Sequence, residues 1–283
     1  MTTIEINGHQ VSLIRQGSGQ PVVLLHCSGA TGAQWHPLIE SLSTQCLVLA
    51  PDLDGHGGTA PWPGLRAYSL ADEAALVGAL VDTLDEPAHI VGHSYGAATA
   101  LHLARARAGQ LRSLTLIEPV AFHLLRGGDD GDTLALNEFA AVGHAMQQAR
   151  RGGDPEGALG HFVDYWHGPG TWASMGPDKR AAMLSGPPVL DLQFPALISD
   201  PARLADFSRM DAPTLLVQGT RTTLAARRLC QRLAQAWPLA RVELVGGAGH
   251  MSPLTHRDQV NALVTAHLLA SADTACFAEA RCS

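Results

Sequence analysis

One serine in this chain stands in a setting that favours nucleophilic chemistry. The stretch 92–96 reads Gly-His-Ser-Tyr-Gly and is the only Gly-x-Ser-x-Gly pattern in the 283 residues. It follows a short strand-forming run, 89–91, and precedes an alanine-rich stretch, 97–107, that favours a helix. In a sharp turn between a strand and a helix, flanking glycines avoid backbone collisions, and the serine side chain is pushed out at the carboxyl edge of the sheet. We therefore predict that Ser94 is a catalytic nucleophile.

The elements that would position this serine alternate between strands and helices. The chain opens with a predicted hairpin, because residues 4–6 and 10–14 alternate in polarity around Asn7-Gly8, a pair that tolerates positive φ in a tight turn. Later apolar runs are typical of strands that are buried on both faces. The predicted strands are 21–25, 46–50, 89–91, 114–117, 214–217 and 242–245, and the predicted helices are 69–84, 97–107, 223–236 and one capped by Thr255. This alternation predicts an α/β fold with a doubly wound, mostly parallel sheet of about eight strands.

The long interval between the strands at 114–117 and 214–217 lacks a strand pattern and contains short amphipathic segments. We predict a helical insertion at 122–208 into a core formed by 1–121 and 209–283, with a loosely ordered tail at 271–283. The acidic stretch 129–132 is interpreted as a solvated loop and not as a calcium site. Aromatic residues gather in the insertion, where they would form a small core, line a ligand cavity, or both. The candidates for lining a cavity are Phe162, Tyr165, Trp166 and Trp172.

Composition excludes several classes of protein. Hydrophobic residues make up 46% of the chain and charged residues 16%, which argues against disorder and fibrous repeats. The net charge is −7 and the basic residues form no stripe, so nucleic acid is not an expected partner. Five widely spaced cysteines suggest neither a disulfide framework nor a zinc site. Without a secretory signal or an apolar stretch of about 18 residues, the expected location is the cytoplasm, with no membrane span.

With the serine turn, the strand order and the insertion taken together, nearly the whole chain resembles the α/β-hydrolase superfamily, in its serine-nucleophile branch with a helical cap. The resemblance implies the chain order nucleophile, acid, histidine, with the histidine after the last strand. That position is His250, which follows the strand at 242–245 and the glycine-rich stretch 246–249. His250 is therefore expected to be the general base for Ser94.

The expected acid departs from the commonest pattern of the superfamily. Members usually place an aspartate after the penultimate strand, but 219–222 reads Gly-Thr-Arg-Thr and has no carboxylate. Some members carry the acid one strand earlier, where this chain has Glu118. We expect Glu118 to orient the histidine. The alternative acids are Asp200, Asp206 and Asp211. A further alternative is a dyad of Ser94 and His250 that is supported by water.

The stretch 26–30, His-Cys-Ser-Gly-Ala, stands where the superfamily forms its oxyanion hole. The resemblance implies that the backbone N–H groups of Ser28 and Tyr95 bind the oxyanion. Cys27 replaces the usual glycine and is interpreted as a buried, unreactive thiol. His26 is expected to hold the loop by hydrogen bonds.

A serine nucleophile indicates acyl chemistry, since the dehalogenase and epoxide hydrolase branches use an aspartate at this turn. The expected protein is a carboxylesterase acting on small to medium esters through an acyl-enzyme, with a small-molecule ester as its partner. No metal or organic cofactor is expected, and the sequence does not decide whether the protein forms a homodimer. The alternatives on the same triad are a carbon–carbon bond hydrolase, a lactonase and an acyltransferase. A ligand-binding protein with little turnover is the alternative from another class.

Overall fold

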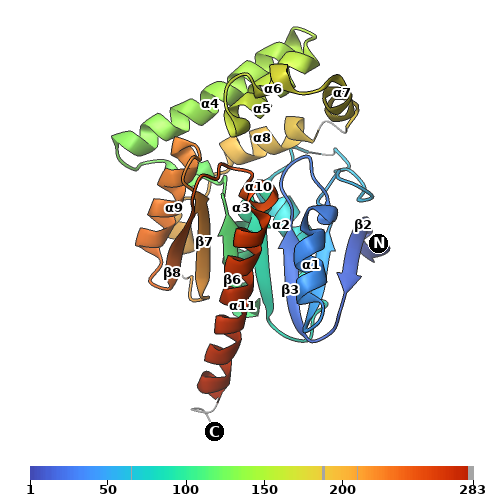
Figure 1. Ribbon diagram of the computed structural model, residues 1–283, viewed down its shortest axis with the longest axis vertical. Coiled ribbons are helices and arrows are strands. Elements are labelled where there is room, and N and C mark those ends of the chain that lie inside the picture. The colour runs from blue at the N-terminus through green and yellow to red at the C-terminus, as the bar shows by residue number, and fades with distance from the viewer. Residues whose placement is uncertain (65, 187–188, 209, 280–283) are drawn as a thin grey trace.

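An eight-stranded sheet forms the centre of the molecule. The computed structural model describes residues 1–64, 66–186, 189–208 and 210–279, with side chains described as far as residue 271. The strands run across the sheet in the order β1-β2-β4-β3-β5-β6-β7-β8 (Figure 1). Their bounds are β1 Thr2–Ile6, β2 His9–Gln16, β3 Gln20–Leu25, β4 Cys46–Pro51, β5 Ala88–His93, β6 Leu111–Ile117, β7 Thr214–Gly219 and β8 Ala240–Val245. The predicted α/β sheet is confirmed.

Strand direction decides where the functional residues emerge. β2 runs antiparallel to its neighbours β1 and β4, and the β1–β2 turn places Asn7 and Gly8 at φ 51° and 80° as the predicted hairpin requires. The neighbouring pairs from β4 across to β8 are all parallel. Parallel strands end at the same edge of a sheet, so the segments that follow β3, β5, β6, β7 and β8 meet at the carboxyl edge.

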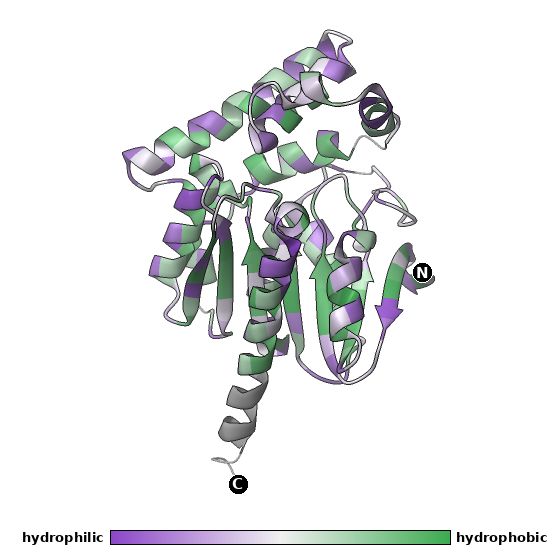
Figure 2. Cartoon of the chain, in the orientation of Figure 1, coloured by the Kyte–Doolittle hydropathy of each residue, from purple (hydrophilic) through white to green (hydrophobic). Residues whose placement is uncertain are grey.

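Helices cover both faces of the sheet, which explains the continuous apolar runs of its central strands (Figure 2). In β3, Val22 and Leu24 belong to one buried apolar cluster, whereas Val23 and Leu25 belong to the other. The bounds of the helices around the sheet are η1 Gly32–Trp35, α1 His36–Leu42, α2 Leu70–Val81, α3 Tyr95–Ala106, η2 Ala108–Gln110, α9 Leu224–Ala236, α10 Ser252–Thr255 and α11 Arg257–Glu279. α2 begins with a capping box between Ser69 and Asp72.

The long interval after β6 is helical and lies beyond the carboxyl edge of the sheet (Figure 1). Its elements are η3 Phe122–Leu125, α4 Asp130–Arg151, α5 Pro155–His167, α6 Thr171–Ser174, α7 Pro177–Ser185, α8 Leu190–Ser199 and η4 Leu204–Phe207. We call α4 to α8 the cap. The absence of a strand pattern in the sequence of this interval corresponds to this helical structure.

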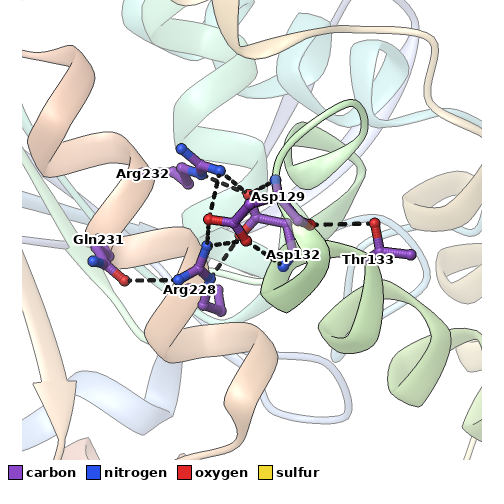
Figure 3. A network of polar contacts seen from close by, with 6 residues as sticks. All are labelled: Asp129, Asp132, Thr133, Arg228, Gln231 and Arg232. Carbon is purple, nitrogen blue, oxygen red and sulfur yellow. Dashed lines mark hydrogen bonds and ion pairs between the residues drawn. The ribbon is translucent and has the colours of Figure 1, made fainter.

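The acidic stretch 129–132 is not the solvated loop predicted from its composition. Asp129 caps α4, and the fully buried Asp132 forms ion pairs with two arginines of α9 (Figure 3). Arg228 Nε donates to Asp132 Oδ1 at 2.7 Å, and Arg232 Nε donates to Oδ2 at 2.6 Å. The aspartates therefore tie the start of the cap to the helix after β7, a contact across about 100 residues that composition does not reveal.

The C-terminal region differs from the prediction at its start. Thr255 does not cap the last helix; it ends α10, and its hydroxyl donates to the Met251 carbonyl at 3.2 Å. α11 begins at Arg257, and its helical backbone includes residues 271–279. The remainder of the predicted tail, 280–283, lies outside the described residues. No helix in the described part of the chain has the combined length and apolar character that a membrane crossing requires.

Candidate active site

Ser94 lies in a strained turn between β5 and α3. Its backbone adopts φ 56° and ψ −116°, a conformation that non-glycine residues rarely occupy. A Cβ atom at Gly92 would lie 2.4 Å from the Gly96 carbonyl oxygen, and a Cβ at Gly96 would lie 2.4 Å from the Leu25 carbonyl oxygen. Only glycine fits at either position, and the turn therefore places the Ser94 side chain at the carboxyl edge of the sheet, as predicted.

His250 reaches this serine from the loop after β8. Its Nε2 lies 2.9 Å from Ser94 Oγ, and the ring is almost completely buried. Burial lowers the pKa of His250 to about 3, and the nearby His167 acts in the same direction. The imidazole is therefore neutral at pH 7, and its Nε2 lone pair is available to accept the serine proton.

Glu118 faces the other ring nitrogen of this histidine. Its Oε2 lies 3.3 Å from His250 Nδ1, and it also accepts a hydrogen bond from the Thr222 hydroxyl. Its Oε1 accepts the Gly219 backbone N–H at 2.6 Å. Burial raises the pKa of Glu118 to about 7, while the donors at Thr222 and Gly219 act in the opposite direction. Ser94, His250 and Glu118 thus form one continuous chain of polar contacts.

Glu118 is the one carboxylate within 4 Å of the His250 ring in the described part of the chain. The three aspartates considered as alternatives are engaged elsewhere or exposed. Asp200 faces His102 and His123, Asp206 accepts the Arg203 backbone N–H at 2.8 Å within η4, and Asp211 is exposed.

Thr222 occupies the position where the superfamily usually carries its acid, and here its hydroxyl supports Glu118. The sequence showed only that this position lacks a carboxylate. Glu118 itself stands at φ 50°, directly after β6, so its backbone as well as its side chain is held in a special conformation.

The two backbone N–H groups expected at the oxyanion hole flank the serine turn. Tyr95 is the first residue of α3, and Ser28 lies in the loop after β3, on the wall of the cavity described below. Among the described hydrogen bonds, none uses the backbone N–H of either residue. Burial raises the pKa of the Cys27 thiol to about 12, so this side chain stays neutral. His26 holds the loop, because its Nε2 accepts the Leu53 backbone N–H at 2.9 Å.

A chain of hydrogen bonds, not apparent from the sequence, connects the loop after β3 to the loop after β8 that carries His250. Gln34 accepts the Cys27 backbone N–H at 3.1 Å, and its side-chain amide lies 3.2 Å from Nδ1 of His93. Nε2 of His93 lies 2.9 Å from the His250 carbonyl oxygen. Burial lowers the pKa of His93 to about 3, so the neutral ring donates from Nε2 and accepts at Nδ1. His93 belongs to the serine motif itself, but its partners are distant in sequence and could not be inferred.

A cavity of about 810 Å³ lies over Ser94 and His250, with walls from the loop after β3 and from the cap. Of the four predicted aromatic lining residues, Phe162 and Trp166 line this cavity. Trp172 and Tyr165 do not belong to its wall: Trp172 packs against Gly160, and the Tyr165 ring packs against Trp166. The missed apolar lining residues include Leu159, Val163, Met175, Met183 and Val189.

Trp166 makes the closest aromatic contact with the site. Its ring stacks on the His250 imidazole with 3.8 Å between centroids and 23° between planes. Leu159, Phe162 and Val163 share its face of α5, because positions 159, 162, 163 and 166 follow helical spacing. That spacing was visible in the sequence and was the signal that could have identified the cavity-facing side of α5.

Comparisons with known proteins agree with this architecture. The model of the alpha/beta hydrolase family matches residues 22–263. Lipase LipV of Mycobacterium tuberculosis is 39% identical over 37% of this chain and 40% of its own length, so the chain matches well under two thirds of that relative. A pimeloyl-[acyl-carrier protein] methyl ester esterase of Xanthomonas oryzae is 27% identical over 87% of this chain and 93% of its own length.

Among solved structures, a thermophilic esterase from Thermogutta terrifontis is similar in fold, with a TM-score of 0.72 and 20% identity over 96% of this chain and 99% of that one. The fold, the serine turn and the family match over residues 22–263 lead to one conclusion: the chain belongs to the α/β hydrolase family.

Proposed function

We propose that the protein is a serine hydrolase that cleaves carboxylic esters of small to medium size through an acyl-enzyme on Ser94. The observation that carries this proposal is the contact chain Ser94–His250–Glu118, in which Ser94 and His250 line the cavity and Glu118 lies behind His250. A serine hydroxyl hydrogen-bonded to a neutral imidazole, which in turn faces a carboxylate, is the arrangement that activates an alcohol for attack on a carbonyl.

We assign each group a step in the proposed reaction. Ser94 Oγ attacks the ester carbonyl while His250 Nε2 takes its proton, and Glu118 stabilises the imidazolium that forms. The N–H groups of Ser28 and Tyr95 receive the developing oxyanion. His250 then returns the proton to the departing alcohol, and a water activated by the same imidazole hydrolyses the acyl-enzyme. The stacked Trp166 excludes solvent from one face of this ring.

The cavity wall indicates which substrates fit. The wall is mainly apolar, most of its apolar side chains come from the cap, and no aspartate or glutamate of the described residues lines it. Its charged lining residues are Arg150 and Lys179, and Arg150 is paired with Asp191 at 3.2 Å. We therefore expect esters with an apolar acyl chain, neutral or anionic at its far end, to bind better than cationic esters. Relatives named as a lipase and as methyl ester esterases agree with ester chemistry.

The test is hydrolysis of p-nitrophenyl esters from acetate to palmitate by the wild-type protein and by Ser94→Ala, at neutral pH without added metal. We expect turnover that depends on Ser94, with a chain-length optimum set by the cavity. Turnover that persists in folded Ser94→Ala would contradict the proposed nucleophile. Absence of turnover on every ester would contradict the proposal and would favour the carbon–carbon bond hydrolase or the ligand-binding alternative.

A further inference from the structure

A second group of ionisable side chains lies away from the site described above, where the cap meets the helix that follows the serine turn. It consists of His102 on α3, His123 in η3 and Asp200 directly after α8. Each residue is at most 5% exposed, and one ligand atom from each lies within 4.8 Å of the others. The proposed ester chemistry uses none of the three.

The carboxylate of Asp200 faces one imidazole with each of its oxygens. His102 Nε2 lies 3.2 Å from Oδ2, and His123 Nε2 lies 3.7 Å from Oδ1. Oδ1 also accepts the Ala202 backbone N–H at 2.8 Å, which fixes the orientation of the carboxylate. Two imidazole nitrogens and a carboxylate therefore converge on a common, solvent-free point.

Hydrogen bonds and ion pairs explain only part of this convergence. His102 pairs with Asp200 at 3.2 Å, but both ring nitrogens of His123 complete no hydrogen bond with the described residues, although buried polar atoms normally have a partner. A proton shared between His102 and Asp200 would satisfy one ring and would leave the 3.7 Å contact of His123 with the same carboxylate without a hydrogen bond.

We propose that His102, His123 and Asp200 bind one divalent transition-metal ion of the zinc class. Such an ion accepts both imidazole lone pairs and the carboxylate at once, with metal–ligand distances of about 2.0–2.2 Å. Ligand atoms bound tetrahedrally to one ion are then about 3.3–3.6 Å apart, so side-chain shifts of about 1–1.5 Å bring the three groups onto the metal. Imidazole donors and only three protein ligands disfavour Ca²⁺ and Mg²⁺, which take mainly oxygen ligands.

The charges around the group agree with a single ion. The Asp200 carboxylate would offset one of the two positive charges of the ion. The neighbouring Arg126 guanidinium donates hydrogen bonds to the carbonyl oxygens of Ile198 and Asp200. The other side is apolar, because the Phe207 ring packs against the His102 ring at 5.8 Å between centroids. The bound ion would join η3 and the end of α8 to α3, and would thereby fasten the base of the cap to the core.

The experiment uses tag-free, full-length protein, stripped with a chelator and then titrated with Zn²⁺ by isothermal titration calorimetry, with the retained metal counted by mass spectrometry after desalting. We expect one Zn²⁺ per chain, a rise in melting temperature on addition of Zn²⁺, and Co²⁺ absorption bands of a low-coordinate site. Ser94→Ala should bind Zn²⁺ as the wild type does, because the two groups share no residue.

His123→Gln and Asp200→Asn are the test variants, and His144→Gln, at an exposed position of α4, is the matched control. We expect retained Zn²⁺ to fall from one equivalent to below about 0.1 in folded test variants and to stay near one in the control. Circular dichroism checks folding, and the Co²⁺ spectrum of the wild type tests the site even if a variant fails to fold. A wild type that retains no stoichiometric Zn²⁺ and gives no such spectrum, or folded test variants that bind like the control, would overturn the proposal.

Discussion

Replacing Glu118 by glutamine tests the proposed triad most directly, because the structure specifies how many donors this carboxylate serves. Gly219 N–H donates to Oε1, whereas the Thr222 hydroxyl and His250 Nδ1 both face Oε2. A glutamine has one carbonyl oxygen and one NH₂ group, so one side of this arrangement must set donor against donor. The negative charge that stabilises the His250 imidazolium is lost as well.

Loss of the carboxylate partner of a catalytic imidazole costs up to about 10⁴ in rate. We expect Glu118→Gln to lower kcat by about 10² to 10⁴, which corresponds to about 2.7–5.4 kcal/mol in the activation barrier, at 1.36 kcal/mol per tenfold. KM should change little, because Glu118 does not line the cavity.

The assay is hydrolysis of a short p-nitrophenyl ester between pH 5.5 and 9, with the burst phase used to count active sites. Because burial raises the pKa of Glu118 to about 7 and the carboxylate is the active form, wild-type kcat should rise with pH through about 7. Glu118→Gln should lose this rising limb. The matched control is Thr222→Val, which keeps the charge, removes one donor and should cost about tenfold or less.

Glu118 would not be the triad acid if folded Glu118→Gln kept more than half of the wild-type kcat with the same pH profile. The acid would then have to be sought among Asp200, Asp206 and Asp211, or His250 would act with water alone.

Three further predictions concern the surroundings of the site. His93→Leu removes the contact with the His250 carbonyl and should lower kcat about tenfold with little change in KM, as measured by steady-state kinetics; equal activity would show that this contact does not position the loop. Asp132→Ala leaves two arginines of α9 without their buried partner and should lower the free energy of unfolding by about 1–3 kcal/mol in urea titrations, with Asp130→Ala as the exposed control. Stability should fall as the pH drops below about 6.5, because five buried histidines with pKa values lowered to about 3 or 4 take up protons only on unfolding, whereas two buried glutamates with raised pKa values take up protons in the folded state. The histidines are His26, His89, His93, His123 and His250, and the glutamates are Glu73 and Glu118. The net difference of about three protons near pH 5 gives a slope of about 4 kcal/mol per pH unit, and stability that stays flat between pH 6.5 and 5 in urea titrations would contradict this balance.

The fold was predictable from sequence because its signals are local. Buried strands require continuous apolar runs such as 21–25, and a tight hairpin requires residues such as Asn7 and Gly8 that tolerate positive φ. The turn at Ser94 needs glycine at 92 and 96 for contacts with nearby backbone. Helix α1 was missed because it has only seven residues, too few for an amphipathic period to stand out.

The composition of the cap led to a wrong prediction where tertiary contacts override local polarity. The stretch 129–132 is acidic enough to predict a solvated loop, yet Asp132 is buried because Arg228 and Arg232 reach it from α9. Trp166 and Tyr165 are adjacent aromatics of similar character, and helical spacing separates Trp166 from Tyr165 on the face that also carries Leu159, Phe162 and Val163. Only the packing of α5 over the site brings that face into contact with His250.

The alternation of strand and helix patterns along the chain was enough to predict the class of fold, and the serine turn was recognisable within one short segment. The histidine after the last strand was expected from the resemblance to the superfamily. Only the tertiary structure decided which carboxylate faces that histidine, since Glu118 and His250 are 132 residues apart and Thr222 and Gly219 come from a third segment. Such convergence depends on strand order and packing, which place the ends of parallel strands at one edge whatever their separation along the chain.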